Sequence, residues 1–162
     1  MQAQYPSQAV YLEVPPQYPQ FLSMPSAHLE SHGERKVCPK DETITHWNPN
    51  NPKSHLLGGF HYNTHTGVLT VPYTGRYYVY AQVFFVARLF LSKNRVFVMA
   101  GNRVLLMINK DLPGGPIEET GSAGGVFILS AGEQISLKPT IYDTALWFGP
   151  NHCYFGAYMI SP

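Results

Sequence analysis

The sequence has little charge, little cysteine and no long apolar run. Charged residues make up 13% of the 162 residues and the formal net charge is +1, so neither nucleic acid nor an acidic membrane is a favoured partner. No stretch of about eighteen apolar residues occurs, so we expect no membrane-spanning helix. The two cysteines, Cys38 and Cys153, are too few for a disulfide scaffold or a cysteine-based zinc site.

Motifs for catalysis are also missing. Seven histidines are scattered along the chain, and His61 and His65 span an expected turn rather than one helix face, unlike a zinc-protease pair. Gly124 and Gly125 fall inside an expected strand and form no phosphate loop. Residues 120–124 only approach the Gly-x-Ser-x-Gly pattern of a serine nucleophile. We therefore expect no enzyme, no cofactor and no metal.

The first 25 residues differ from the rest. They are rich in proline, glutamine and tyrosine, which favours an extended, polyproline-like leader or stalk. Residues 1–7 have neither the basic nor the apolar segment of a signal peptide. Composition alone leaves open a cytosolic protein or the extracellular part of a longer precursor. We expect one further domain, residues 26–162, since that length suits a single core.

Residues 26–162 consist of short apolar runs separated by glycine, proline and asparagine. No helical period persists, so the pattern predicts strands. Gly101 and Asn102 suit a two-residue hairpin turn. About ten antiparallel strands in one domain indicate an all-β sandwich or jelly roll. The expected strands are residues 27–31, 44–47, 59–62, 68–71, 76–87, 95–99, 103–109, 124–129, 134–138 and 153–160.

The strand expected at 76–87 is apolar on both faces. A strand exposed on one side should alternate apolar and polar residues, so a second element or molecule must cover its outer face. Alternation places Tyr77, Val79, Ala81, Val83 and Phe85 toward the core. The opposite face carries Tyr78, Tyr80, Gln82 and Phe84, and the last strand adds Tyr154 and Tyr158. Aromatic rings with hydroxyl groups are typical of a buried but partly polar interface.

Residues 69–85, read as Leu-x-Val-x-x-x-Gly-x-Tyr-Tyr-Val-x-x-Gln-Val-x-Phe, resemble the signature of the tumour necrosis factor (TNF) ligand family. Three more blocks follow the family's order: Trp47 before Gly58-Gly59-Phe60, residues 123–135, and Tyr154-Phe155-Gly156-Ala157. The resemblance covers roughly residues 26–160 and is greatest to ectodysplasin-like and invertebrate members. Arg76 departs from it, because the family prefers an aliphatic residue there.

The resemblance implies a ten-stranded jelly roll that forms a homotrimer and binds receptors with cysteine-rich repeats in the grooves between subunits. It also implies an extracellular protein, secreted or shed from a type II membrane precursor. The expected trimer-interface residues are Tyr78, Tyr80, Gln82, Phe127, Tyr154 and Tyr158. The expected receptor-binding residues are Leu146, Trp147 and Phe148 in an exposed loop, Arg88 and Phe90 after the long strand, and Met99 and Asn102 at a hairpin.

Three alternatives stay open. Trp147 could instead cap the sandwich. Cys38 and Cys153 could form a disulfide, since the first and last strands of this jelly roll pair antiparallel, or could be unrelated thiols. The fold could also be the globular head of a complement-type trimer, which Asn63, Thr66, Gly67, Pro72 and Gly75 fit loosely, or a structural jelly roll such as a capsid protein.

Overall fold

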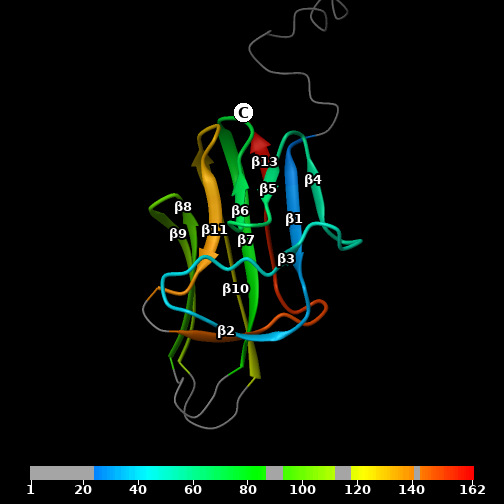
Figure 1. The fold of residues 1–162 in the computed structure, drawn as a ribbon. Coiled ribbons are helices and arrows are strands. Elements are labelled where there is room, and N and C mark those ends of the chain that lie inside the picture. The colour runs from blue at the N-terminus through cyan, green and yellow to red at the C-terminus, as the bar shows by residue number, and fades with distance from the viewer. Residues whose placement is uncertain (1–23, 87–92, 112–117, 141–142) are drawn as a thin grey trace, which may run out of the picture.

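The computed structural model describes residues 24–86, 93–111, 118–140 and 143–162. Within these ranges the chain folds into antiparallel strands joined by turns and loops, with no helix (Figure 1). The expected all-β jelly roll is therefore confirmed. No helix in the described ranges has the length and apolar character needed to cross a membrane.

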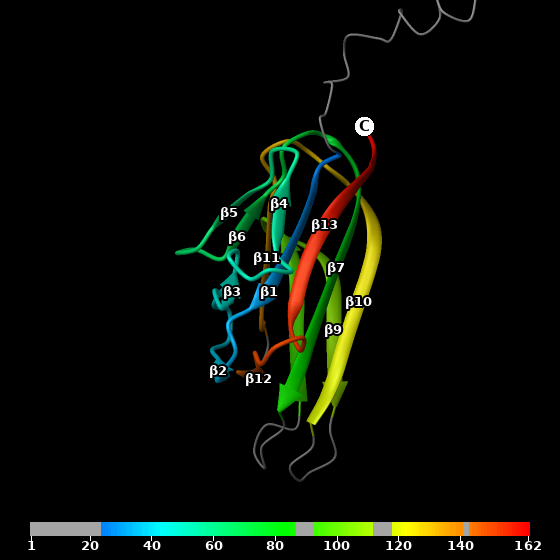
Figure 2. The same cartoon turned by 90° about the vertical axis from the view of Figure 1, so that its right-hand side faces the viewer.

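The first sheet contains the long strand β7 and the last strand, β13. Its strand order is β2-β12-β7-β13-β1-β3, with β10 paired to β7 and β4 paired to β1. Figure 2 shows β1, β13, β7 and β10 side by side. The bounds are β1 Ser26–Ser31, β2 Arg35–Cys38, β3 Trp47–Asn48, β4 His55–Leu57, β7 Gly75–Val86, β10 Glu118–Leu129, β12 Thr144–Trp147 and β13 Tyr154–Ser161.

The second sheet covers the inner face of the first. Its order is β5-β6-β11-β8-β9, with bounds β5 His61–Asn63, β6 Val68–Thr70, β8 Lys93–Ala100, β9 Arg103–Asp111 and β11 Gln134–Lys138. Gly101 and Asn102 join β8 to β9 in a tight turn, and Gly101 has the positive φ of 59° that such a hairpin turn favours.

The core lies between the two sheets, and β7 supplies its centre. The residues of β7 that alternation places inward, from Tyr77 to Phe85, are all 2% exposed or less. Leu69, Ile135 and Leu137 of the second sheet are fully buried in the same cluster. The hydroxyl of Tyr77 donates to the Tyr73 carbonyl at 2.7 Å, so this large ring is buried with its polar atom satisfied.

Three short strands differ from the expectation. β2, β4 and β12 fall where the sequence indicated connections, and β10 begins at Glu118 rather than at residue 124. β2 and β4 are mostly exposed and carry no long alternation. β12 is almost entirely buried, so it shows an apolar run instead of a period of two residues.

Candidate functional site

The outer face of the first sheet is a layer of tyrosines that no element among the described residues covers. Register on β7 and β13 sets Tyr154 opposite Gln82, Gly156 opposite Tyr80, and Tyr158 opposite Tyr78. We call Tyr78, Tyr80, Gln82, Tyr154 and Tyr158 the tyrosine face. Each is half-buried or exposed, and Tyr158 is 46% exposed.

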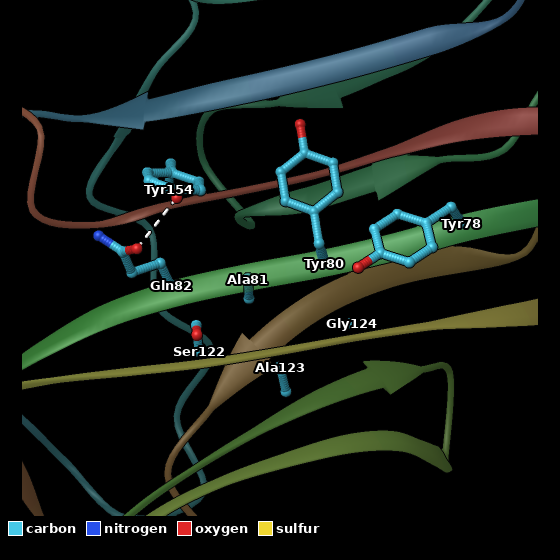
Figure 3. Close-up of a pocket in the computed structure, with 8 residues that line it drawn as sticks. All are labelled: Tyr78, Tyr80, Ala81, Gln82, Ser122, Ala123, Gly124 and Tyr154. Carbon is cyan, nitrogen blue, oxygen red and sulfur yellow. Dashed lines mark hydrogen bonds between the residues drawn. The ribbon is translucent and has the colours of Figure 1, made fainter.

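The rings of the tyrosine face contact one another. Ring centroids lie 6.1 Å apart for Tyr78 and Tyr80, 5.5 Å for Tyr78 and Tyr158, and 6.2 Å for Tyr80 and Tyr154. The Tyr154 hydroxyl donates to Oε1 of Gln82 at 3.0 Å (Figure 3). Nε2 of Gln82 then donates to the His152 carbonyl at 3.2 Å. These contacts hold the rings in place, which reduces the entropy lost if a partner binds.

Two glycines provide room for the tyrosine rings. A Cβ at Gly124 would collide with the hydroxyl of Tyr78, and one at Gly156 would collide with the Ala27 carbonyl and lie 2.5 Å from the Tyr80 hydroxyl. The rings therefore lie flat across the neighbouring strands. Between them is an open hollow of about 540 Å³, lined by Tyr78, Tyr80, Ala81, Gln82, Ser122, Ala123, Gly124 and Tyr154 (Figure 3).

Phe127 is not on this face, so its expected place there is wrong. Phe127 pairs with Tyr77 on β7 and shares the inward-facing side of the sheet, where it packs against the core. Register decides the face of a strand, and the sequence did not show the register of β10. The residues of β10 that share the outer face include Thr120, Ser122, Gly124, Val126 and Ile128.

A second apolar surface lies along the neighbouring edge of the sandwich. β9 and β10 run close together there without hydrogen-bonded pairing (Figure 2). Four apolar side chains are at least half exposed: Val104 50%, Met107 51%, Val126 52% and Ile128 71%. We call these four residues the apolar edge. Exposed apolar side chains on two neighbouring edge strands favour an interaction surface there.

At the other side of the tyrosine face is a polar cluster that sequence reasoning missed. On β1, His28 Nδ1 lies 2.6 Å from the Tyr80 hydroxyl, and His28 Nε2 lies 2.5 Å from Oε2 of Glu30. His55 of β4 stacks on His28 with centroids 6.2 Å apart. The only signal in the sequence was that His28 and Glu30 alternate with the buried Ala27 and Leu29.

Several residues expected to contact a receptor are in the core. Leu146 and Phe148 are fully buried, so the exposed loop expected around them is wrong. Met99, expected to be exposed at the hairpin, is also buried, at 6% exposed. Residues 144–147 form a buried strand between β2 and β7. Phe148 packs against Trp47 and His46.

Of the remaining receptor candidates, two lie within the described residues, Trp147 and Asn102. Trp147 is half-buried, and the Arg35 guanidinium lies 5.4 Å above its ring. Asn102 is exposed at the β8–β9 turn. Their role in binding stays a prediction. Arg88 and Phe90 lie outside the described residues.

Cys38 and Cys153 are both free and buried, so of the two alternatives left open the structure has the separate thiols. β1 and β13 do pair antiparallel, but Cys38 belongs to β2, where it lies opposite Thr144 of β12. Burial raises the pKa of each thiol to about 12. The Cys153 thiol donates to the Trp147 carbonyl at 3.2 Å and accepts from the Phe84 amide at 3.3 Å. Such thiols are poor nucleophiles at neutral pH.

The described residues present two exposed surfaces, the tyrosine face and the apolar edge. Among the described residues, no three His, Cys, Asp or Glu side chains converge as metal ligands would. The tyrosine face and the apolar edge are two adjoining exposed surfaces on one jelly roll, since Val126 of the edge lies opposite Tyr78 of the face. Exposed surfaces of this mixed aromatic and apolar kind are typical of β-sandwich domains that bind other proteins.

The chain belongs to the TNF (tumour necrosis factor) family, whose model matches residues 45–160. Members of this family are ligands that act outside the cell and are generally not enzymes. The family assignment favours the TNF interpretation over the complement-type head and the capsid-like protein.

A solved structure supports the fold independently. The structure of Eiger TNF from S. frugiperda matches with a TM-score of 0.73 and 16% identity, covering 85% of this chain and 92% of that chain. At this identity the match shows that the two folds are alike. No curated protein matches the chain.

Proposed function

We propose that this TNF family ligand acts as a homotrimer in which the tyrosine face of one subunit packs on the apolar edge of the next. The observation that carries the proposal is the uncovered tyrosine face itself. Its half-buried rings, Gln82 and the hollow between them have the mixed aromatic and polar character of the centre of an interface.

The two surfaces adjoin and differ in composition, which suits a contact that joins the tyrosine face of one subunit to the apolar edge of the next. A head-to-tail contact repeated around a three-fold axis covers all of them and closes the ring. Closure matters because an open head-to-tail contact would grow into a fibre. The trimer of the TNF family supplies such a closed arrangement.

A trimer has three equivalent grooves between subunits, and we propose that receptors with cysteine-rich repeats bind there. One receptor in each groove brings three receptor chains together, so modest groove affinities add up to strong binding. Trp147 with Arg35 above it is the best candidate for a contact residue, since Trp and Arg are frequent at the centres of interfaces. Asn102 is a second candidate. We further propose that the chain is the extracellular part of a secreted or membrane-anchored precursor.

Sedimentation of the purified protein tests the trimer. The wild type is expected to sediment as a trimer at micromolar concentration. Tyr80→Ala and Tyr154→Asp each remove an aromatic anchor, which at such a position is worth about 2 kcal/mol, and should shift the protein toward monomer. Thr64→Asp, at an exposed position in the β5–β6 turn of the second sheet, should stay trimeric. A wild-type monomer would contradict the proposal.

Binding to a panel of cysteine-rich receptor ectodomains tests the proposed receptor binding. One or more members should be retained by the wild-type trimer. Trp147→Ala should weaken that binding about tenfold or more without dissolving the trimer, and Thr64→Ala should not weaken it. A stable trimer that binds no member of the panel would contradict receptor clustering while leaving the trimer intact.

A further inference from the structure

The hollow in the tyrosine face is not filled by any described side chain of its own subunit. Its walls are the rings of Tyr78, Tyr80 and Tyr154 together with Gln82, and β10 contributes only small side chains there (Figure 3). The hollow is open and holds about 540 Å³. The core of a stable interface packs to the density of a protein interior. A subunit that covers the tyrosine face is therefore expected to place a side chain in this hollow.

Met107 of β9 lies at the same level of the sandwich as this hollow. The residues of β10 that line the hollow stand between Gly121 and Gly125. β9 runs beside that part of β10, since a Cβ at Gly121 would lie 2.6 Å from Cγ2 of Ile108. A Cβ at Gly125 would lie 3.6 Å from Cδ2 of Leu106. Met107 stands between these two β9 residues and is 51% exposed, so its side chain is level with the hollow but on the apolar edge.

The rest of the apolar edge lies nearer the other end of the tyrosine face. Val126 pairs with Tyr78. The Arg103 guanidinium donates to the Ile128 carbonyl at 3.3 Å, so the adjacent Val104 is also at that end. Both surfaces thus extend along the strands, and an axis that lets one surface cover the other over its whole length runs roughly parallel to them. Rotation about such an axis keeps the height of every residue, so each edge residue meets the neighbour's face at its own level.

We propose that Met107 of each subunit inserts into the hollow of the next subunit's tyrosine face and so fixes how the two surfaces are aligned. This inference rests on the proposed trimer and names one contact within it. Met107 is the one unbranched member of the apolar edge, and a flexible methionine side chain can follow the shape of an irregular gap. Its sulfur also makes favourable contacts with aromatic rings at about 5 Å, and three tyrosine rings surround the hollow.

Methyl NMR of the wild-type protein tests the contact without altering it. The protein carries isotope-labelled methionine methyl groups and protonated tyrosine rings in an otherwise deuterated background, and Met107→Leu assigns the Met107 signal by its loss. In the trimer this methyl group should show nuclear Overhauser contacts to tyrosine ring protons. Within its own subunit Met107 borders a hollow whose described lining contains no tyrosine, so such contacts would come from a neighbouring subunit.

Disulfide cross-linking tests the alignment of the two surfaces. Met107→Cys combined with Gln82→Cys should give covalent trimers on a non-reducing denaturing gel after mild oxidation, because Gln82 borders the hollow. Val104→Cys combined with Gln82→Cys is the matched control, since Val104 is 50% exposed but lies at the other end of the apolar edge, and it should cross-link poorly. Both pairs are oxidised at a concentration at which they sediment as trimers. The native thiols of Cys38 and Cys153 are buried.

Sedimentation equilibrium measures how much the contact contributes. Met107→Ala leaves the hollow empty, whereas Met107→Leu fills it with a side chain of similar volume. Met107→Ala should raise the three-subunit dissociation constant about a thousandfold, which is about tenfold for each of the three contacts. Met107→Leu should raise it far less.

The outcomes separate this contact from the trimer as a whole. A wild-type trimer whose Met107 methyl group shows no contact with tyrosine rings would overturn the inference and leave the proposed function standing. So would cross-linking that is equal for the two cysteine pairs, or equal dissociation constants for Met107→Ala and Met107→Leu. A wild-type monomer would instead contradict the trimer on which the inference rests.

Discussion

The two buried cysteines are the residues whose state is easiest to check. In the structure, Cys38 and Cys153 are free thiols in the core, and burial raises the pKa of each to about 12. We expect Cys38 and Cys153 to react very slowly with an aromatic disulfide reagent in the folded protein, and both to react rapidly in denaturant, because the reactive species is the exposed thiolate. A spectroscopic thiol count in the two conditions measures this.

The same count decides between free thiols and a disulfide. Two thiols that appear only on unfolding support the structure. No thiol in denaturant, with two after reduction, would show that a bridge had formed. Rapid reaction of the native protein would contradict the burial of both side chains.

His46 should make the fold less stable in acid. Burial, and to a smaller extent the charges of Lys36 and His32, hold its pKa below the ordinary value of 6.5 despite nearby Glu34. The unfolded chain therefore binds more protons, and the free energy of unfolding falls as the pH drops through about 6.5. Because this ring packs on Phe148 at 5.0 Å, His46→Gln is expected to lower stability at neutral pH but to lose less on acidification. Urea unfolding at pH 7.5 and 5.5 measures the difference, and an equal loss in both proteins would contradict it.

At the scale of single strands, alternation of apolar and polar residues predicted the buried face of β7 correctly. The two faces of β7 follow from its period of two residues, and the structure has the expected inward set fully buried. The same reasoning failed for Phe127, because its face depends on how β10 pairs with β7. A single sequence carries no direct information on that register.

The contact between His28 and Tyr80 could not be predicted from the sequence either, because it depends on the order of the strands in the sheet. His28 meets Tyr80 only because β1 and β7 lie on either side of β13. That order brings together residues 52 positions apart in the chain. β12 was mistaken for a loop because its four residues are flanked by turn-forming residues and have no polar face. An apolar run of this length fits a buried strand and an exposed aromatic loop equally well.

Neighbouring residues of β12 provide a test of its buried position. Leu146 is fully buried opposite Phe85 of β7, so Leu146→Ala should lower the free energy of unfolding by about 2–5 kcal/mol. Trp147 points to the half-exposed side under Arg35, and Trp147→Ala should lower it by about 1 kcal/mol. Chemical denaturation at one fixed protein concentration measures both. Equal losses would contradict the assigned faces.

At the scale of the whole molecule, the central feature is that one subunit exposes two adjoining surfaces of different composition, the tyrosine face and the apolar edge. A head-to-tail assembly uses the tyrosine face of one copy and the apolar edge of another. A defect in either surface should therefore break every contact in a uniform population, although each defective subunit keeps one good surface. In a dimer built from two like surfaces, by contrast, a defective subunit keeps no surface through which it can pair.

Mixing two variants tests that distinction. Tyr80→Asp damages the tyrosine face and Met107→Asp damages the apolar edge, where the Met107 side chain is 51% exposed. Each protein alone should be monomeric, because a charge at a desolvated contact is strongly disfavoured. A one-to-one mixture should form a heterodimer through the two undamaged surfaces, and should stop there, because the remaining surfaces are both damaged and cannot close the ring. Native mass spectrometry with one protein isotopically labelled counts the species. Recovery of full trimers, or no heterodimer at all, would contradict a head-to-tail contact between these two surfaces.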